Sequence, residues 1–133
     1  MNHETQIRWA DADEAPDILA FIQAMGFNPR DKVTWDQLEM VAMSAWQGGK
    51  LIGAIPLEPR PLKIAPDKTV WAMHETVVAV HPEYRGGGIG TQMQHEIFTT
   101  LPTEIELLSV FREEPESPAY RWYVKNNFRP ALQ

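Results

Sequence analysis

Cysteine is absent from this chain of 133 residues. Its absence excludes disulfide bonds, thiolate metal sites and a cysteine nucleophile, and we expect no metal cofactor. No apolar run approaches the roughly 20 residues that a membrane-spanning helix requires. Residues 1–14 are polar and acidic, unlike a secretory signal peptide. We therefore expect a soluble, cytoplasmic protein that does not contact a membrane.

Positive charge is also scarce, since 12 Lys and Arg residues stand against 18 Asp and Glu residues, a net charge of −6. This balance argues against nucleic acid as a partner, because phosphate backbones attract basic surfaces. It also means that any site for an anionic cofactor must be locally positive. A cationic ligand is weakly favoured over an anionic one.

Apolar residues make up 44% of the chain, and its length suits one domain with a hydrophobic core. No internal repeat is visible, so residues 1–133 are expected to form a single domain. The most informative stretch is residues 77–93, VVAVHPEYRGGGIGTQM. Its first four residues predict a buried strand, and residues 85–90 form a glycine-rich turn that leads into a helix. Ile89, Met93 and Ile97 then recur on one helical face.

The glycine-rich turn (residues 85–90) is typical of a phosphate-binding site. Backbone N–H groups at a helix start lack intrahelical partners, and the helix dipole adds positive potential there. A nucleoside triphosphate loop is excluded, because no Gly-Lys-Ser/Thr follows the glycines. A dinucleotide fold is not favoured, because the next expected strand, residues 105–111, has no acid at its end. The alternative is a turn that merely joins strand to helix.

The remaining pattern predicts a mixed α/β sheet. Asp11 or Asp13 caps a first helix that ends at Gly26, and Gly48-Gly49 forms a hairpin. A second short helix would include Trp35, Leu38 and Val41. Strands are expected at 6–10, 41–47, 50–57, 69–80 and 105–111, helices at 88–100 and 119–126, and a proline-rich loop at 58–69. A helix joins the last two strands, so they should be parallel neighbours through a right-handed crossover.

Two motifs resemble the GNAT superfamily of N-acetyltransferases. Arg85, Gly88 and Gly90, preceded by Val80-His81-Pro82, match its acyl-CoA signature Arg/Gln-x-x-Gly-x-Gly/Ala. Residues 119–128, AYRWYVKNNF, match its C-terminal Ala-x-x-hydrophobic-Tyr-x-Lys-x-Gly-Phe pattern except at Asn127. Asparagine is the residue best able to replace glycine in the left-handed conformation of a helix end. The resemblance covers residues 6–128, approximately.

The resemblance implies a GNAT-like fold and an enzyme that transfers an acetyl group from acetyl-CoA to a primary amine by direct attack. The backbone of residues 78–80 would hold the pantetheine arm, and the glycine-rich turn would hold the pyrophosphate. The implied cofactor-binding residues are Val78, Ala79, Val80, Arg85, Gly86, Gly87, Gly88, Ile89, Gly90 and Thr91. The acceptor, a small-molecule or peptide amine, is not identified by the sequence. The alternative is an inactive CoA-binding sensor or partner-binding module.

The resemblance also suggests catalytic residues. Tyr123 would protonate the leaving thiolate, or else only anchors its helix. His74 would be the general base, its neutral imidazole having a suitable pKa, or it merely faces the substrate cleft or solvent. Strand alternation places His74, Thr76, Val78 and Val80 on one face, and Glu75 would serve if a bulge shifts the register. His81 is interpreted as shaping the turn. Pocket or core roles both remain for the aromatic residues Trp35, Trp46 and Trp71.

The sequence departs from the family pattern in two places. Glu116 stands where members often carry an asparagine that contacts the pantetheine arm. Only residues 129–133 follow the second motif, too few for the hairpin that usually ends the fold. We therefore expect the sheet to lack its last one or two strands. A homodimer or a missing C-terminal segment would then cover the apolar strand 105–111, unless the 58–69 loop does so.

Overall fold

The computed structural model describes residues 4–27, 41–75, 77–110 and 125. Two α-helices, α1 and α3, and six strands account for most of these residues. Two short 3-10 helices, η1 (Ala12–Glu14) and η2 (Pro82–Tyr84), precede the α-helices. The other elements are β1 (Thr5–Trp9), α1 (Ala15–Ala24), β2 (Val41–Gln47), β3 (Lys50–Ala65), β4 (Lys68–Glu75), β5 (Ala79–Val80), α3 (Ile89–Thr100) and β6 (Ile105–Val110).

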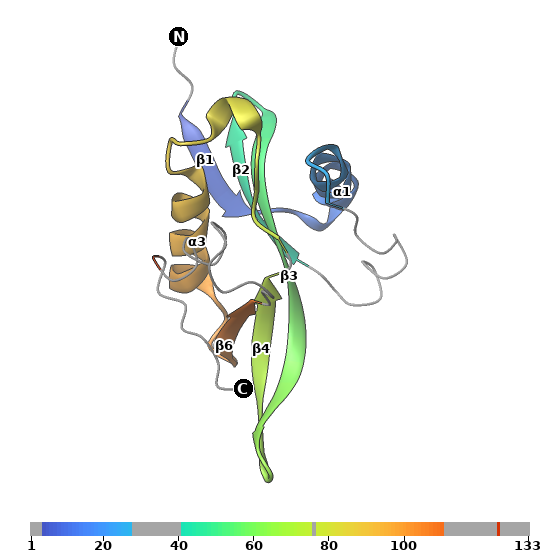
Figure 1. The fold of residues 1–133 in the computed structure, drawn as a ribbon, viewed down its shortest axis with the longest axis vertical. Coiled ribbons are helices and arrows are strands. Elements are labelled where there is room, and N and C mark those ends of the chain that lie inside the picture. The colour runs from blue at the N-terminus through green and yellow to red at the C-terminus, as the bar shows by residue number, and fades with distance from the viewer. Residues whose placement is uncertain (1–3, 28–40, 76, 111–124, 126–133) are drawn as a thin grey trace.

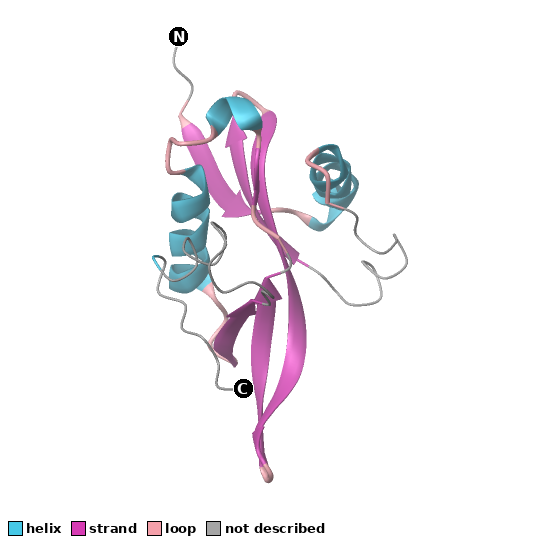
Figure 2. Ribbon diagram, in the orientation of Figure 1, coloured by secondary structure: helices cyan, strands magenta, loops and turns pink. Residues whose placement is uncertain are grey.

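The strands form one mixed sheet in the order β1-β2-β3-β4-β6, with β5 paired to β3. All pairs are antiparallel except β4 with β6, which are parallel neighbours joined through α3. This confirms the predicted parallel pairing of these two strands. The two α-helices lie on opposite faces of the sheet (Figure 1). The sheet continues past both helices as a long β3–β4 hairpin (Figure 2).

Each helix buries one apolar stripe. On one face, α3 packs Ile89, Met93 and Ile97 against a cluster that includes Met43 and Ile55. On the other face, α1 packs its stripe against the small residues of β2 and β3, in a cluster made of Ile18, Leu19, Ile22, Ala42 and Ala54. The alternation along β2, from Ala42 to Met43, separates the two cores as a period of two requires.

Gly53 allows α3 to approach the sheet closely. A Cβ atom at this position would lie 2.9 Å from Met93 Cε and 3.2 Å from Ile89 Cγ2. The first turn of α3 therefore rests directly on β3. This contact fixes the height of the helix start above the sheet, which matters because the glycine-rich turn leads into it.

The expected proline-rich loop is wrong, because residues 58–65 continue β3 and pair with β4. Pro59 lies opposite Met73 and Pro61 opposite Trp71. Proline lacks the N–H that a second neighbour would require, and strands tolerate it at an edge. Among the described strands, β3 has only β4 beside it beyond Leu57. The backbone nitrogens of prolines two residues apart point to the same edge of the strand, so one free edge accommodates both prolines.

The expected strand 69–80 is divided into two. Glu75 of β4 pairs with Leu57, whereas Ala79 of β5 pairs with Ala54. Three residues separate Glu75 from Ala79 in the sequence, whereas two separate their partners Leu57 and Ala54, so this side of the ladder carries one extra residue, as in a β-bulge. Met73 before the bulge and Val78 and Val80 after it pack into the same core beneath α3. The predicted common face of His74, Val78 and Val80 is therefore wrong, because the bulge reverses the alternation.

Several predictions fall on residues that the structure does not describe. These are Thr76, the short helix around Trp35 and Leu38, and the C-terminal helix with Tyr123, of which only Lys125 is described and is helical. Val41 belongs to β2 and to no helix. Within the described part, β6 has β4 as its one strand neighbour.

Candidate functional site

The glycine-rich turn is fastened to the sheet by the residues before it. The His81 N–H donates to the Ile52 carbonyl at 2.8 Å, which continues the pairing of β5 with β3. His81 Nδ1 accepts from the Glu83 N–H at 3.2 Å, so this histidine shapes the turn as predicted. Arg85 Nε donates to the Val80 carbonyl at 2.9 Å. The turn therefore has a defined position above the end of β5.

Gly88 is the N-cap of α3 and has a left-handed backbone, with φ at 81°. The Gln92 N–H donates to the Gly88 carbonyl at 2.9 Å, which is the first bond of the helix. The N–H groups of Ile89, Gly90 and Thr91 precede it and so lack intrahelical acceptors. A Cβ atom added at Gly86 or at Gly88 would meet no atom within 4 Å. The space beside Gly86 and Gly88 at this positive helix end is therefore open, an arrangement that suits a phosphate group.

Lys50 adds positive charge that the sequence reading did not identify. Its Nζ lies 5.7 Å from the centre of the Tyr84 ring, in η2 just before the glycine-rich turn. The Gly48-Gly49 hairpin places Lys50 at the start of β3, and its distance in sequence from the turn concealed this proximity. Lys50 and Arg85 therefore bring two positive charges to the turn, beside the one negative charge of Glu83 in η2.

Two described residues lie between β4 and β5. Val77 and Val78 belong to neither strand, although both side chains are half-buried and pack against the cores. Ala79 is buried at 2% exposure and resumes pairing with β3. Of the ten residues implied to bind the cofactor, the structure thus places 78–80 and 85–91 in one continuous path from the bulge to α3.

His74 lies in β4 beside an ion pair whose carboxylate is largely buried and whose guanidinium is exposed. Its register partner in β3 is Glu58, whose two carboxylate oxygens accept from Arg60 Nε and Nη2 at 2.8 and 3.2 Å. Burial lowers the pKa of His74 below 6.5, the positive charge of Arg60 lowers it further, and Glu58 partly opposes this. The imidazole is therefore neutral at pH 7 and able to accept a proton.

Glu75 lies on the other side of the sheet. Its side chain is fully buried, and its Oε2 accepts from Gln94 Nε2 of α3 at 2.6 Å. Glu75 has the same alternation as Met73, and because the extra residue follows it, Glu75 shares the α3 side of the sheet with Val78 and Val80. This is the register shift under which Glu75 was expected to serve as the alternative base. The structure therefore separates the two base candidates, and Glu75 joins β4 to α3. Tyr123 lies outside the described residues.

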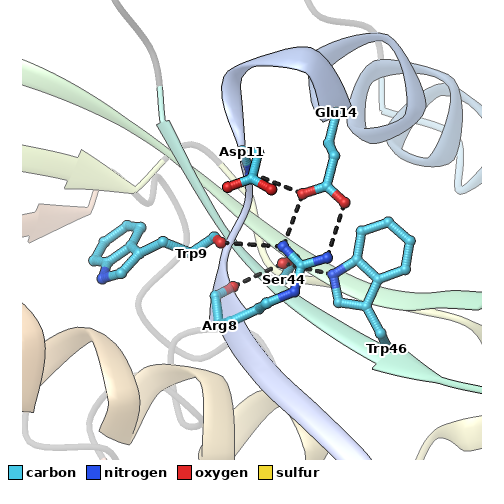
Figure 3. Close-up of polar contacts among 6 residues, drawn as sticks. All are labelled: Arg8, Trp9, Asp11, Glu14, Ser44 and Trp46. Atoms are coloured by element: carbon cyan, nitrogen blue, oxygen red, sulfur yellow. Dashed lines mark hydrogen bonds and ion pairs between the residues drawn. The ribbon is translucent and has the colours of Figure 1, made fainter. Parts of the chain in front are cut away.

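The tryptophans do not form one pocket among the described residues. Trp46 lies under Arg8, whose guanidinium carbon is 4.9 Å from the ring centre, and its Nε1 donates to Ser44 at 2.8 Å (Figure 3). Arg8 also donates twice to Glu14 at 2.8 Å. Hydrogen bonding to Arg8 is the main reason that the pKa of Glu14 falls to about 2. This network anchors the start of α1 to β1. Trp71 is 51% exposed on the β3–β4 hairpin.

Two classes of feature are not found within the described ranges. No three side chains of His, Asp or Glu come together in a way that could hold a metal ion. None of the helices described is long and apolar enough to cross a membrane.

Comparison with known proteins identifies the family. The profile described as acetyltransferase (GNAT) domain matches residues 39–130, which is more than half of the chain. Comparison with curated proteins finds no significant match.

The fold is shared with solved acetyltransferase structures. The chain superposes on the aminoglycoside N-acetyltransferase AAC(6')-Iy in complex with CoA, with a TM-score of 0.78, 11% identity, and coverage of 100% of this chain and 93% of that one. It is similar to a ribosomal-protein-alanine N-acetyltransferase from Brucella melitensis biovar Abortus 2308 (TM-score 0.72, 16% identity, 98% and 96% coverage).

A transcriptional regulator from Bacillus halodurans C-125 is also similar, with a TM-score of 0.73, 16% identity, and coverage of 98% and 96%. Identities this low show a common fold, whereas the profile match to residues 39–130 shows the family. The chain therefore belongs to the GNAT acetyltransferase family, whose members are acyl-CoA-dependent N-acyltransferases.

Proposed function

We propose that this protein transfers an acetyl group from acetyl-CoA to a primary amine of a small molecule or peptide. The observation that carries the proposal is the path from the bulge to the N-terminus of α3. Open N–H groups at Ile89, Gly90 and Thr91 follow two left-handed glycines, in a chain that matches the GNAT domain. AAC(6')-Iy, which has the same fold, was solved with CoA and with a bisubstrate analogue of CoA and an acetylneamine.

Each part of this path has a role in the proposed reaction. The N–H groups at the start of α3 bind the pyrophosphate of the donor, and Lys50 and Arg85 supply positive charge nearby. The unpaired backbone at residues 77–78 receives the pantetheine arm as an added strand would. Holding the thioester rigidly supplies much of the rate, because an oriented reactant has already lost its translational and rotational freedom.

The chemical step is a direct attack. The amine nitrogen forms a bond to the thioester carbonyl carbon, and the carbon–sulfur bond breaks. The amine proton passes to the neutral imidazole of His74, directly or through water. The CoA thiolate takes a proton, for which the family motif proposes the Tyr123 hydroxyl. The products are an N-acetylated amine and free CoA.

Two measurements test the proposal. Isothermal titration should show acetyl-CoA binding, and free thiol should appear when acetyl-CoA is mixed with a panel of primary amines. Tyr123→Phe should lower turnover and leave donor affinity unchanged, because the hydroxyl acts in the transition state. No acetyl-CoA binding near millimolar concentration would refute the proposal.

A second candidate is a domain that binds CoA without transfer, as a sensor or partner-binding module. The same fold occurs in a protein described as a transcriptional regulator, and Glu116 replaces a residue that often contacts the pantetheine arm. Tight CoA binding without thiol release from any amine would favour this candidate. Unchanged function of Tyr123→Phe in cells would agree with it.

A further inference from the structure

Three charged or titratable side chains share one face of the β3–β4 hairpin. Glu58 and His74 are direct register partners, and such partners point to the same face. Arg60 follows Glu58 by two residues along the strand and therefore points to that face too. The opposite face carries Met73 and Glu75, beneath α3. This group was missed in the sequence because residues 58–69 were predicted to be a loop.

The ion pair in this group is unequal in exposure. The Glu58 side chain is 11% exposed, whereas the Arg60 side chain is 52% exposed. A buried carboxylate is costly to desolvate unless a cation or hydrogen-bond donors compensate it. An ion pair whose cation reaches in from solvent contributes little to stability. Another cation could therefore replace Arg60 on this carboxylate with little loss of fold stability.

Glu58 lies where a cation of the acceptor could replace Arg60. Register partners in an antiparallel pair have Cβ atoms about 5 Å apart, so a nitrogen held at His74 has its neighbouring atoms close to the Glu58 carboxylate. A second ammonium group of the same acceptor would meet a charge of opposite sign there. A group without charge would instead leave the Arg60–Glu58 pair in place.

We propose that Glu58 selects the acceptor by binding a second cationic centre of the amine substrate, and that Arg60 occupies the carboxylate when that centre is absent. The ligand class is diamines and polyamines, including larger amines that carry a neighbouring ammonium group. This inference rests on the proposed acetyl transfer for the identity of the acceptor site. The contacts between Glu58 and Arg60 stand independently of it.

The inference predicts opposite effects for the two halves of one ion pair. Glu58→Gln should weaken binding of 1,4-diaminobutane about tenfold, because a charge-assisted hydrogen bond is lost. Arg60→Gln should strengthen it about threefold, because the competing cation is removed. Binding of 1-aminobutane, which has the same chain length and one ammonium group, should change in neither variant. A purely structural pair would respond to both variants in the same direction.

The experiment is calorimetric titration of each amine into the full chain in the presence of CoA at pH 8. In the wild type His74 is neutral at this pH, because burial lowers its pKa below 6.5. Lys63→Gln removes one positive charge from the same hairpin without touching Glu58, and serves as the matched control. Urea unfolding of each variant shows that the fold is retained. If Glu58→Gln does not fold, Arg60→Gln alone still shows whether removing Arg60 strengthens or weakens the binding of 1,4-diaminobutane.

The two proposals fail differently. Absent or equal binding of the two amines, or a shift of the same sign in both variants, overturns the inference even if the protein acetylates some other amine. Selective diamine binding with the predicted opposite shifts supports it even if no thiol is released. Absence of acetyl-CoA binding refutes the proposed function and leaves this comparison unaffected.

Discussion

At the scale of single residues, the proposed reaction depends on His74 being neutral. Its pKa is lowered below 6.5 by burial and by Arg60, so kcat/KM should be constant near pH 7. The rate should fall only as the pH decreases through this lowered pKa. His74→Ala should remove that acidic limb and reduce kcat by about 100-fold, in the range usual for a general base. The pH–rate profile of both proteins measures this.

The pH–rate profile of His74→Ala can also contradict the role of His74 as general base. A limb that persists unchanged in His74→Ala would move the base to Glu75 or to a water chain. Glu75→Gln then becomes the informative variant. Glu75 is fully buried and hydrogen-bonded to Gln94. The unfolding free energy of the Glu75→Gln variant should therefore be measured together with its turnover rate. Loss of activity through loss of fold would otherwise resemble loss of a base.

The binding roles of Arg85 and the glycines stay predictions, whereas residue types and spacing predicted correctly that His81 shapes the turn and that this turn leads into α3, because both depend on local sequence. Residue types and spacing did not predict which side of the sheet Glu75 and His74 face relative to Val78. The side that each of them faces depends on one extra residue in the pairing of β3 with β4 and β5, and no residue type in the sequence 76–78 indicates a bulge. Glu58 and Arg60 were missed for a related reason. Both lie in a strand pairing that the prolines of residues 58–69 concealed.

At the scale of elements, the glycine-rich turn offers a comparison between adjacent residues. Gly88 has φ at 81°, so Gly88→Ala should lower the unfolding free energy by about 1–2 kcal/mol through backbone strain. Gly87 has no left-handed backbone, and a Cβ atom there would lie an ordinary 3.6 Å from the Tyr84 carbonyl. Gly87→Ala should therefore be nearly neutral. Urea unfolding measures both.

The same pair of variants tests the binding role of this element. Because Gly88 sets the direction of the following N–H groups, Gly88→Ala should weaken acetyl-CoA binding more than Gly87→Ala does. Equal stability of both variants would contradict the left-handed backbone at Gly88. Equal loss of affinity would instead place the phosphate contact elsewhere on the turn.

Most elements were predictable because each has a local cause. The stripe of α1, the Gly48-Gly49 hairpin, the stripe of α3 and the parallel pairing of β4 with β6 all follow from period, turn residues and crossover rules. The length of β3 did not follow. Prolines indicate a loop unless the strand lies at an edge, and edge position is a property of the assembled sheet.

At the scale of the whole molecule, the edge formed by β6 leads to a prediction about assembly. Residues 58–69 pair β3 with β4, so the alternative in which this segment covers β6 is wrong. In the described part of the chain β6 pairs with β4 alone, and we propose that another copy of the chain covers its other edge, since a free apolar strand edge favours association. Light scattering after size exclusion should give about twice the 15.2 kDa of one chain. A strictly monomeric chain at high micromolar concentration would contradict self-association.

Stability of the whole molecule should also depend on acid in two steps. The folded-state pKa of His74 is lowered from 6.5, so the unfolded chain takes up this proton first and stability falls as the pH drops below 6.5. The folded-state pKa of Glu14 is lowered from 4.5 to about 2, so its contribution to stability is complete above pH 4.5 and is lost between pH 4.5 and pH 2.

Urea unfolding as a function of pH tests this assignment. In Glu14→Gln only the second step, between pH 4.5 and pH 2, should become flatter. Glu4→Gln, which changes the charge equally but lies outside the Arg8 network, should leave both steps as they are in the wild type. A second step that survives in Glu14→Gln would place the acid-sensitive contact elsewhere than the junction of β1 with α1.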